Sequence, residues 1–239
     1  MAKAEKTTKV GPITYHRGVI QGGDEWHALR CGLITASEVK LLLTPTLKRA
    51  VNDKSRAHVW ELAAQRITRY VEPSYVGDDM LRGHEDEFHA RQLYAEKYAP
   101  VEEVGFVTND SFGFTLGCSP DGLVGDDGMI ECKSRRQKFQ IQTIVEHWRD
   151  GTPPEDYVLQ NQTGMLVCDR KWLDLVSYSG GLPMAVMRIE RNPEICEAII
   201  DAARAAEVAI AAVIADYAAA VKVNGYAPTE RTERQEMHT

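Results

Sequence analysis

The sequence of 239 residues contains no apolar run approaching the ~20 residues that a membrane-spanning helix requires. Its first residues are polar and basic, without the apolar stretch of a signal peptide. Five cysteines are present, an odd number, and no two of them form a Cys-x-x-Cys pair. This pattern argues against a disulfide framework and against a zinc ribbon. We therefore expect a cytoplasmic protein with reduced thiols and no membrane partner.

The chain also lacks an excess of positive charge, because its formal net charge is −7. Proteins that bind nucleic acid usually carry a basic face, so the average charge argues against that class. Local fields decide binding, however, and they can differ from the average. A site of several carboxylates that holds divalent metal also looks acidic, because the metal charge is not counted.

Length and composition are those of one ordinary α/β domain. Apolar residues make up 44% and charged residues 26%, which is close to globular averages and excludes a disordered or fibrous chain. Apart from the Ala-rich end, no repeat or low-complexity block occurs. We expect a partly flexible leader over residues 1–20, a single domain over 21–222 and a polar tail over 223–239.

Apolar periodicity predicts strands in the middle of the chain with helices on either side. The predicted helices span residues 24–29, 39–43, 53–70, 85–98, 154–167 and 193–221. The predicted strands span residues 101–108, 113–116, 128–134, 172–178 and 185–190. This order favours an α/β fold with a mixed central sheet flanked by helices. The apolar spacing of the last helix fits a core position and a subunit contact equally well.

Two carboxylates and a lysine form the most informative pattern. Asp121 lies in a Ser-Pro-Asp-Gly turn, and Glu131 and Lys133 flank Cys132 in a predicted strand. Alternate residues of a strand point to one face, so Glu131 and Lys133 should project together. Carboxylates on adjacent strands can share a hard cation, and a nearby lysine can orient or deprotonate water. Hydrolysis of a phosphodiester bond requires this chemistry.

The Glu-x-Lys spacing alone does not establish a site. It is expected about once by chance in a chain of this length, and a charge pair on a solvated face is then the simpler explanation. The sequence contains a second copy, Glu38-Val39-Lys40. That copy falls in a predicted helix, where residues i and i+2 face different ways, and we set it aside.

Four segments, in order across residues 21–162, together resemble the YqaJ-like viral recombinase family, the alkaline exonucleases that include the phage lambda enzyme. The first segment is a Gln-Gly and a Trp ahead of Arg and Ile-Thr-Ala-Ser, and the third combines Ser-Pro-Asp-Gly with Glu-Cys-Lys. Both are specific motifs. The four segments are Gln21–Ser37, Gly83–Ala90, Cys118–Lys133 and Tyr157–Gln162.

The resemblance implies a restriction-endonuclease-like core and a two-metal, Mg²⁺-dependent exonuclease, with Mn²⁺ as an alternative ion. Such an enzyme degrades the 5′-ended strand of duplex DNA to mononucleotides and leaves a 3′ single strand. The resemblance also implies a homotrimeric ring. It implies a single-strand annealing protein as partner, in DNA recombination of phage or prophage origin.

The resemblance also implies roles for individual residues. The metal ligands would be Asp121, Glu131, the backbone carbonyl of Cys132 and, at a second metal, Glu87. The nucleophile would be oriented or activated by Lys133 and Gln160. The 5′-phosphate of the DNA would be bound by Arg30, Thr35, Ser37 and Ser119. The apolar wedge at the terminal base pair would be Met80.

The proposed phosphate pocket also follows from side-chain chemistry. Arginine is the preferred bidentate partner of phosphate, and hydroxyls at a helix N-terminus add donors. Simpler roles remain for each residue: Ser37 as a helix cap, Arg30 as a surface cation and Met80 as a core residue. We prefer the pocket because Arg30, Thr35 and Ser37 occur together.

Several assignments stay open between neighbours. Glu87 is favoured over Glu85 and Asp86 by its spacing from Gly83, and Gln160 over Gln162 by the preceding tyrosine. The basic run over residues 133–138 fits a DNA-tracking segment and a solubilising loop equally well.

Two other functions compete with the exonuclease. A restriction-type endonuclease would use the same Asp, Glu-x-Lys set, and a catalytically idle protein could simply bind DNA ends.

Overall fold

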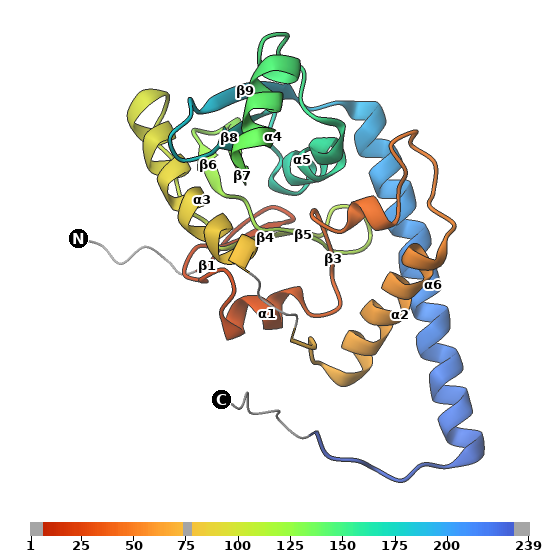
Figure 1. Cartoon of the computed structure of the whole chain (residues 1–239). Coiled ribbons are helices and arrows are strands. Elements are labelled where there is room, and N and C mark those ends of the chain that lie inside the picture. Colours follow the sequence, from red (N-terminus) through yellow and green to blue (C-terminus); the bar gives the residue numbers. More distant parts are fainter. Residues whose placement is uncertain (1–6, 74–77, 232–239) are drawn as a thin grey trace.

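Two mixed β-sheets and the helices around them form the structure (Figure 1). The computed structural model describes residues 7–73 and 78–231, except for the side chains of residues 78–80. The strands are β1 Thr7–Val10, β2 Ile13–His16, β3 Ile34–Thr35, β4 Phe106–Asn109, β5 Leu116–Cys118, β6 Gly122–Val124, β7 Gly128–Ser134, β8 Trp172–Tyr178 and β9 Ala185–Glu190. The helices are α1 Asp24–Arg30, η1 Val39–Leu41, α2 Asp53–Thr68, α3 Asp78–Lys97, α4 Gln137–Gln142, η2 Thr143–Trp148, α5 Glu155–Cys168 and α6 Pro193–Asn224.

Local sequence signals set the starts of α2 and α6. The side chain of Asn52 accepts a hydrogen bond from Ser55 N at 3.0 Å, and Ser55 Oγ accepts one from Asn52 N at 3.1 Å. This reciprocal capping box satisfies two backbone donors at the start of α2. The side chain of Asn192 caps α6 by accepting from the backbone N–H groups of Glu194 and Ile195, and Pro193 at the first helical position needs no hydrogen-bond acceptor.

The first sheet has the strand order β1-β2-β4-β5-β3, with only β3 and β5 parallel among its pairs in the described residues. The second sheet has the order β6-β7-β8-β9, in which β7 and β8 are parallel and the outer pairs antiparallel. An antiparallel bridge between Glu102 and Leu123 links the chain beside β4 to β6. The expected mixed α/β class is confirmed, although we predicted one central sheet.

Strand β7 separates two apolar clusters, and this places its polar residues. Ile130 and Cys132 pack toward α3, in a cluster with Ala90 and Tyr94. Met129 belongs to the larger core cluster on the other side, which includes residues of α5 and α6. Because side chains alternate along a strand, Glu131 and Lys133 share the side of Met129, which faces α5.

The structure differs from the sequence prediction at the N-terminal end. Residues 7–16, expected in a loose leader, form the hairpin β1–β2, with Gly11 at φ +58° in its turn. Strand β1 is mostly exposed and polar, so it has no alternating apolar pattern that would have revealed it. Pairing of β2 with β4 ties the hairpin to the first sheet.

Further differences concern short elements and the start of one helix. Residues 39–41 form only a 3-10 turn, so the predicted helix and its dipole are missing beside Ser37. We also missed β6, whose three residues are too few for a period, and the α4–η2 segment. Helix α3 begins at residue 78, seven residues before the predicted start at residue 85.

Within the described residues, no helix is both long and apolar enough to cross a membrane.

Candidate active site

Asp121 lies at the junction of the two sheets. It follows β5 of the first sheet by three residues and directly precedes β6 of the second. Its carboxylate is buried and accepts a hydrogen bond from the backbone N–H of Cys132 at 2.5 Å. This bond fixes Asp121 against the middle of β7, beside Glu131 and Lys133.

Glu131, Lys133 and Gln160 form a closed triangle of hydrogen bonds. Lys133 Nζ lies 2.6 Å from Glu131 Oε1 and donates to Gln160 Oε1 at 3.1 Å. Gln160 Nε2 donates to the same Glu131 oxygen at 2.5 Å. The lysine also lies over the ring of Tyr157, with 5.1 Å from Nζ to the ring centroid. Helix α5 therefore supplies the two side chains that orient the lysine of β7.

Glu87 approaches this group from α3. It accepts a hydrogen bond from Arg91 Nη1 at 3.0 Å, and the same nitrogen donates to the backbone carbonyl of Asp121 at 3.2 Å. Arg91 also contacts Glu103 at 3.3 Å. Glu85, the alternative in the sequence, is exposed. The structure thus brings Glu87 to Asp121 and leaves Glu85 in solvent.

The buried carboxylates repel one another. Burial, followed by the charges of Glu131 and Glu87, raises the pKa of Asp121 well above its usual range. Burial and the charge of Glu131 likewise raise the pKa of Glu87, against the opposing effect of Arg91. Burial, the largest single effect, would lower the pKa of Lys133, but the charge and hydrogen bond of Glu131 together with the charge of Asp121 outweigh it and the pKa is raised. The lysine therefore stays protonated in this arrangement.

This donor set fits a divalent cation by its chemistry. The described residues contain no group of three or more His, Cys, Asp or Glu side chains already arranged as a metal cluster. Asp121 and Glu131 each use one carboxylate oxygen in the hydrogen bonds above, and the other accepts none from the described residues. Hard cations prefer such oxygens, and a cation would offset the repulsion that raises the pKa of Asp121.

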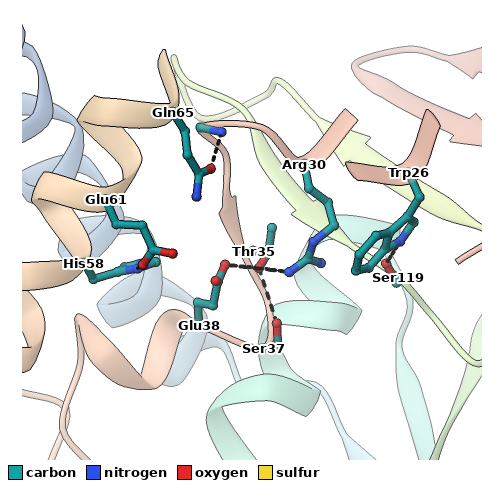
Figure 2. Close-up of polar contacts among 10 residues, drawn as sticks. Trp26, Arg30, Thr35, Ser37, Glu38, His58, Glu61, Gln65 and Ser119 are labelled. Carbon is teal, nitrogen blue, oxygen red and sulfur yellow. Dashed lines mark hydrogen bonds and ion pairs between the residues drawn. The ribbon is translucent and has the colours of Figure 1, made fainter. Parts of the chain in front are cut away.

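The residues predicted to bind a 5′-phosphate lie together (Figure 2). Arg30 Nη2 donates to Thr35 Oγ1 at 3.2 Å, and the hydroxyl oxygens of Thr35 and Ser37 are 3.3 Å apart. The guanidinium of Arg30 stacks on Trp26, with 4.3 Å between Cζ and the ring centroid. The indole N–H of Trp26 in turn donates to Ser119 Oγ at 2.8 Å. Trp26 therefore links two predicted phosphate ligands, a role that the sequence did not reveal.

A single cavity connects the two groups of residues. It has a volume of about 190 Å³, and its lining includes Arg30, Ser37 and Ser119 as well as Asp121, Glu131 and Gln160. A second cavity, of about 330 Å³, shares Gln21 and Asp121 with the first and is lined by Glu87 and Arg91. Asp121 thus lies at the boundary between the two cavities.

The other candidate residues from the sequence analysis do not lie at the site or lie outside the described side chains. Gln162, the alternative to Gln160, is buried elsewhere, where it donates to the carbonyl of Glu190 and accepts from Asn192 N. The wedge assigned to Met80 lies outside the described side chains. Arg91 and Glu38 contact the site residues but were not predicted to belong to the site, because their partners are distant in sequence or lie across a turn.

Comparisons with known proteins identify the family of the chain. Residues 25–171 match the model of the YqaJ-like viral recombinase domain. The alkaline exonuclease LHK-Exo from Laribacter hongkongensis is similar in structure, with 34% identity, a TM-score of 0.73 and coverage of 84% of this chain and 100% of that one. Its complex with dAMP matches at 35% identity, a TM-score of 0.72 and the same coverage.

A phage-related exonuclease from Haemophilus somnus 129PT shares the fold at 15% identity, with a TM-score of 0.53 and coverage of 77% of this chain and 96% of that one. No curated protein matches. The family model covers more than half of the chain, and LHK-Exo aligns over its whole length. The expected restriction-endonuclease-like α/β core is therefore confirmed, and the chain belongs to the YqaJ-like viral recombinase family.

Proposed function

We propose that this protein is a Mg²⁺-dependent exonuclease that degrades the 5′-ended strand of duplex DNA to mononucleotides. The observation that carries the proposal is the cavity shared by Arg30, Ser37 and Ser119 with Asp121, Glu131 and Gln160. A terminal 5′-phosphate held at Arg30 would lie in the same cavity as the carboxylates, so the strand would be cut close to its 5′ end. Cleavage there releases a mononucleotide and creates a new 5′-phosphate on the strand.

The residues divide the chemistry between them. Asp121 and Glu131, with the Cys132 carbonyl and Glu87, would hold the metal, which lowers the pKa of bound water and neutralises charge on the phosphate. Lys133 donates hydrogen bonds to the attacking water or to a phosphate oxygen. Gln160 holds Lys133 and Glu131 at a fixed separation, so that the attacking oxygen meets the phosphorus from one direction.

The relatives support the substrate class. LHK-Exo is an alkaline exonuclease, and its complex with dAMP is a complex with a deoxynucleoside monophosphate, the product class proposed here. A homotrimeric ring, a phage or prophage origin and a single-strand annealing protein that coats the 3′ strand complete the proposal. Mn²⁺ is expected to replace Mg²⁺, because both ions accept oxygen ligands.

The test uses linear duplex DNA labelled at one 5′-phosphate, next to a closed circular duplex, with Mg²⁺ and with EDTA. We expect labelled mononucleotide from the linear DNA only, and only with Mg²⁺. A nicked circle would indicate an endonuclease, and binding without cleavage would indicate an end-binding protein.

Substitutions in the same assay identify the site. Asp121→Ala and Lys133→Ala should abolish cleavage while DNA binding survives. Lys171→Ala removes an exposed lysine paired with Asp127 and should leave the rate unchanged. Wild-type rates from Asp121→Ala or Lys133→Ala would remove the proposed active site.

A further inference from the structure

A carboxylate lies beside two of the predicted phosphate ligands. Glu38 Oε2 accepts a hydrogen bond from Thr35 Oγ1 at 2.5 Å and lies 3.8 Å from Arg30 Nη2. Figure 2 shows Thr35 between Glu38 and Arg30, with all three side chains directed toward one another. An acidic side chain is unexpected there, because the pocket would bind a dianion and the negative charge opposes it.

Glu38 is not the main support of Arg30. The guanidinium stacks on Trp26 at 4.3 Å and donates to Thr35 at 3.2 Å, whereas its separation from Glu38 is longer than a hydrogen bond. Stacking on Trp26 and the hydrogen bond to the Thr35 hydroxyl fix the plane of the guanidinium, and neither contact requires the charge of Glu38. Loss of the Glu38 charge should therefore leave Arg30 in place.

The charge of Glu38 must act on whatever anion Arg30 binds. A phosphate on Arg30 would lie only a few ångströms beyond the guanidinium, within one Debye length of the carboxylate. Glu38 is about two-thirds buried, with a side chain 32% exposed, so water screens the repulsion incompletely. A phosphate bound at Arg30 would therefore be attracted by the guanidinium and repelled by the nearby carboxylate of Glu38.

We propose that Glu38 limits the affinity of this pocket for a phosphate monoester, so that the released nucleotide leaves and the next 5′-phosphate can enter. The proposal rests on the exonuclease function above. An exonuclease makes a new phosphate monoester at every step, and the monophosphate it releases competes for the same pocket. An all-cationic pocket would retain that product and slow every subsequent turnover.

The test measures binding and turnover separately. Titration calorimetry in EDTA gives the affinity of wild type, Glu38→Gln and Glu38→Asp for dAMP and for inorganic phosphate, with no catalysis required. Glu38→Gln keeps an acceptor for Thr35 and should bind both ligands about tenfold more tightly, as expected for a partly screened unit charge a few ångströms away. Glu38→Asp keeps the charge and should stay within about twofold of wild type.

The control is Glu61→Gln, which makes the same change in net charge on α2. Glu61 pairs with His58 rather than with Arg30, so this variant should bind dAMP like wild type. In the nuclease assay, Glu38→Gln should show stronger inhibition by dAMP and a steady-state turnover that is slow relative to its own first turnover. A damaged pocket would weaken binding instead of strengthening it.

Unchanged or weaker dAMP binding by Glu38→Gln would overturn the proposal, even if the wild type proved to be an active exonuclease. An inactive wild type would overturn the proposed function. The calorimetric comparison would still report whether Glu38 weakens the anion site.

Discussion

Gln160 bridges Lys133 and Glu131, donating to the carboxylate at 2.5 Å and accepting from the ammonium at 3.1 Å. Both partners belong to β7, whereas Gln160 belongs to α5 on the face of the second sheet. The lysine therefore has its position set from two elements. A lysine held only by Glu131 would populate several side-chain rotamers.

Gln160→Ala should lower kcat by roughly tenfold to hundredfold, as expected for loss of a residue that orients a catalytic group. Single-turnover cleavage of 5′-phosphorylated duplex measures this effect. Gln162→Ala is the matched control two residues away. It should leave kcat near wild type but cost about 1–3 kcal/mol in the free energy of unfolding, because the buried side chain of Gln162 and its hydrogen bonds to the backbone of Glu190 and Asn192 are lost. The reverse pattern would show that we chose the wrong glutamine.

Glu87→Gln should raise the Mg²⁺ concentration for half-maximal activity by about tenfold, because a carboxylate beside Asp121 loses its charge. Glu85→Gln should have no such effect, since Glu85 is exposed. Magnesium titrations of the two variants next to wild type provide the comparison. Equal titration curves for all three proteins would exclude Glu87 from the metal site.

Arg30→Ala should remove the preference for 5′-phosphate over 5′-hydroxyl ends, a loss of about tenfold to hundredfold on the phosphorylated substrate alone. Arg30→Lys should restore little of it, because an ammonium neither forks to phosphate nor stacks flat on Trp26. Arg204→Ala, which removes an exposed arginine paired with Asp201, is the control. Persistence of the preference in Arg30→Ala would place the end-binding pocket elsewhere.

Without metal, the stability of the protein should fall as pH rises. The pKa of Asp121 is raised in the folded state, so the folded protein holds this proton more tightly than the unfolded chain does. The stabilisation is complete below the unfolded pKa of about 3.9 and is lost as pH rises through the folded pKa. Thermal unfolding in EDTA between pH 5 and 8 should therefore show a larger drop in Tm for wild type than for Asp121→Asn.

Adding Mg²⁺ at pH 8 should recover the Tm of wild type but not that of Asp121→Asn, because the cation binds the folded state through the ionised carboxylate. Parallel curves of Tm against pH for the two proteins in EDTA would mean that ionisation of Asp121 does not destabilise the folded protein.

The sequence predicted best where periodicity and burial coincide. Strands β8 and β9 match their predicted ranges, and β7 presents Glu131 and Lys133 on one side as alternation requires. The pairing between distant segments could not be predicted in this way. The division into two sheets depends on which edges meet, and nothing in the local pattern of β5 or β6 encodes that choice.

The contacts of the candidate site show the same limit. The types and spacing of Asp121, Glu131 and Lys133 indicated the chemistry, whereas the roles of Arg91 and Trp26 arise from contacts across 30 and 93 residues. Glu38 was noticed only as part of a chance Glu-x-Lys copy. Its position against Arg30 depends on the turn after β3, which we had predicted as a helix.

The segment Ser119-Pro120-Asp121 joins the two sheets, and its two ends serve different purposes. Ser119 follows a strand of the first sheet and lies with the proposed phosphate ligands, whereas Asp121 precedes a strand of the second and lies with the carboxylates. The proline between them has a fixed φ, which makes the connection stiff. In the proposed exonuclease, this segment would keep the 5′-phosphate site and the metal site at a constant separation. The length of the released product would then depend on three residues of backbone.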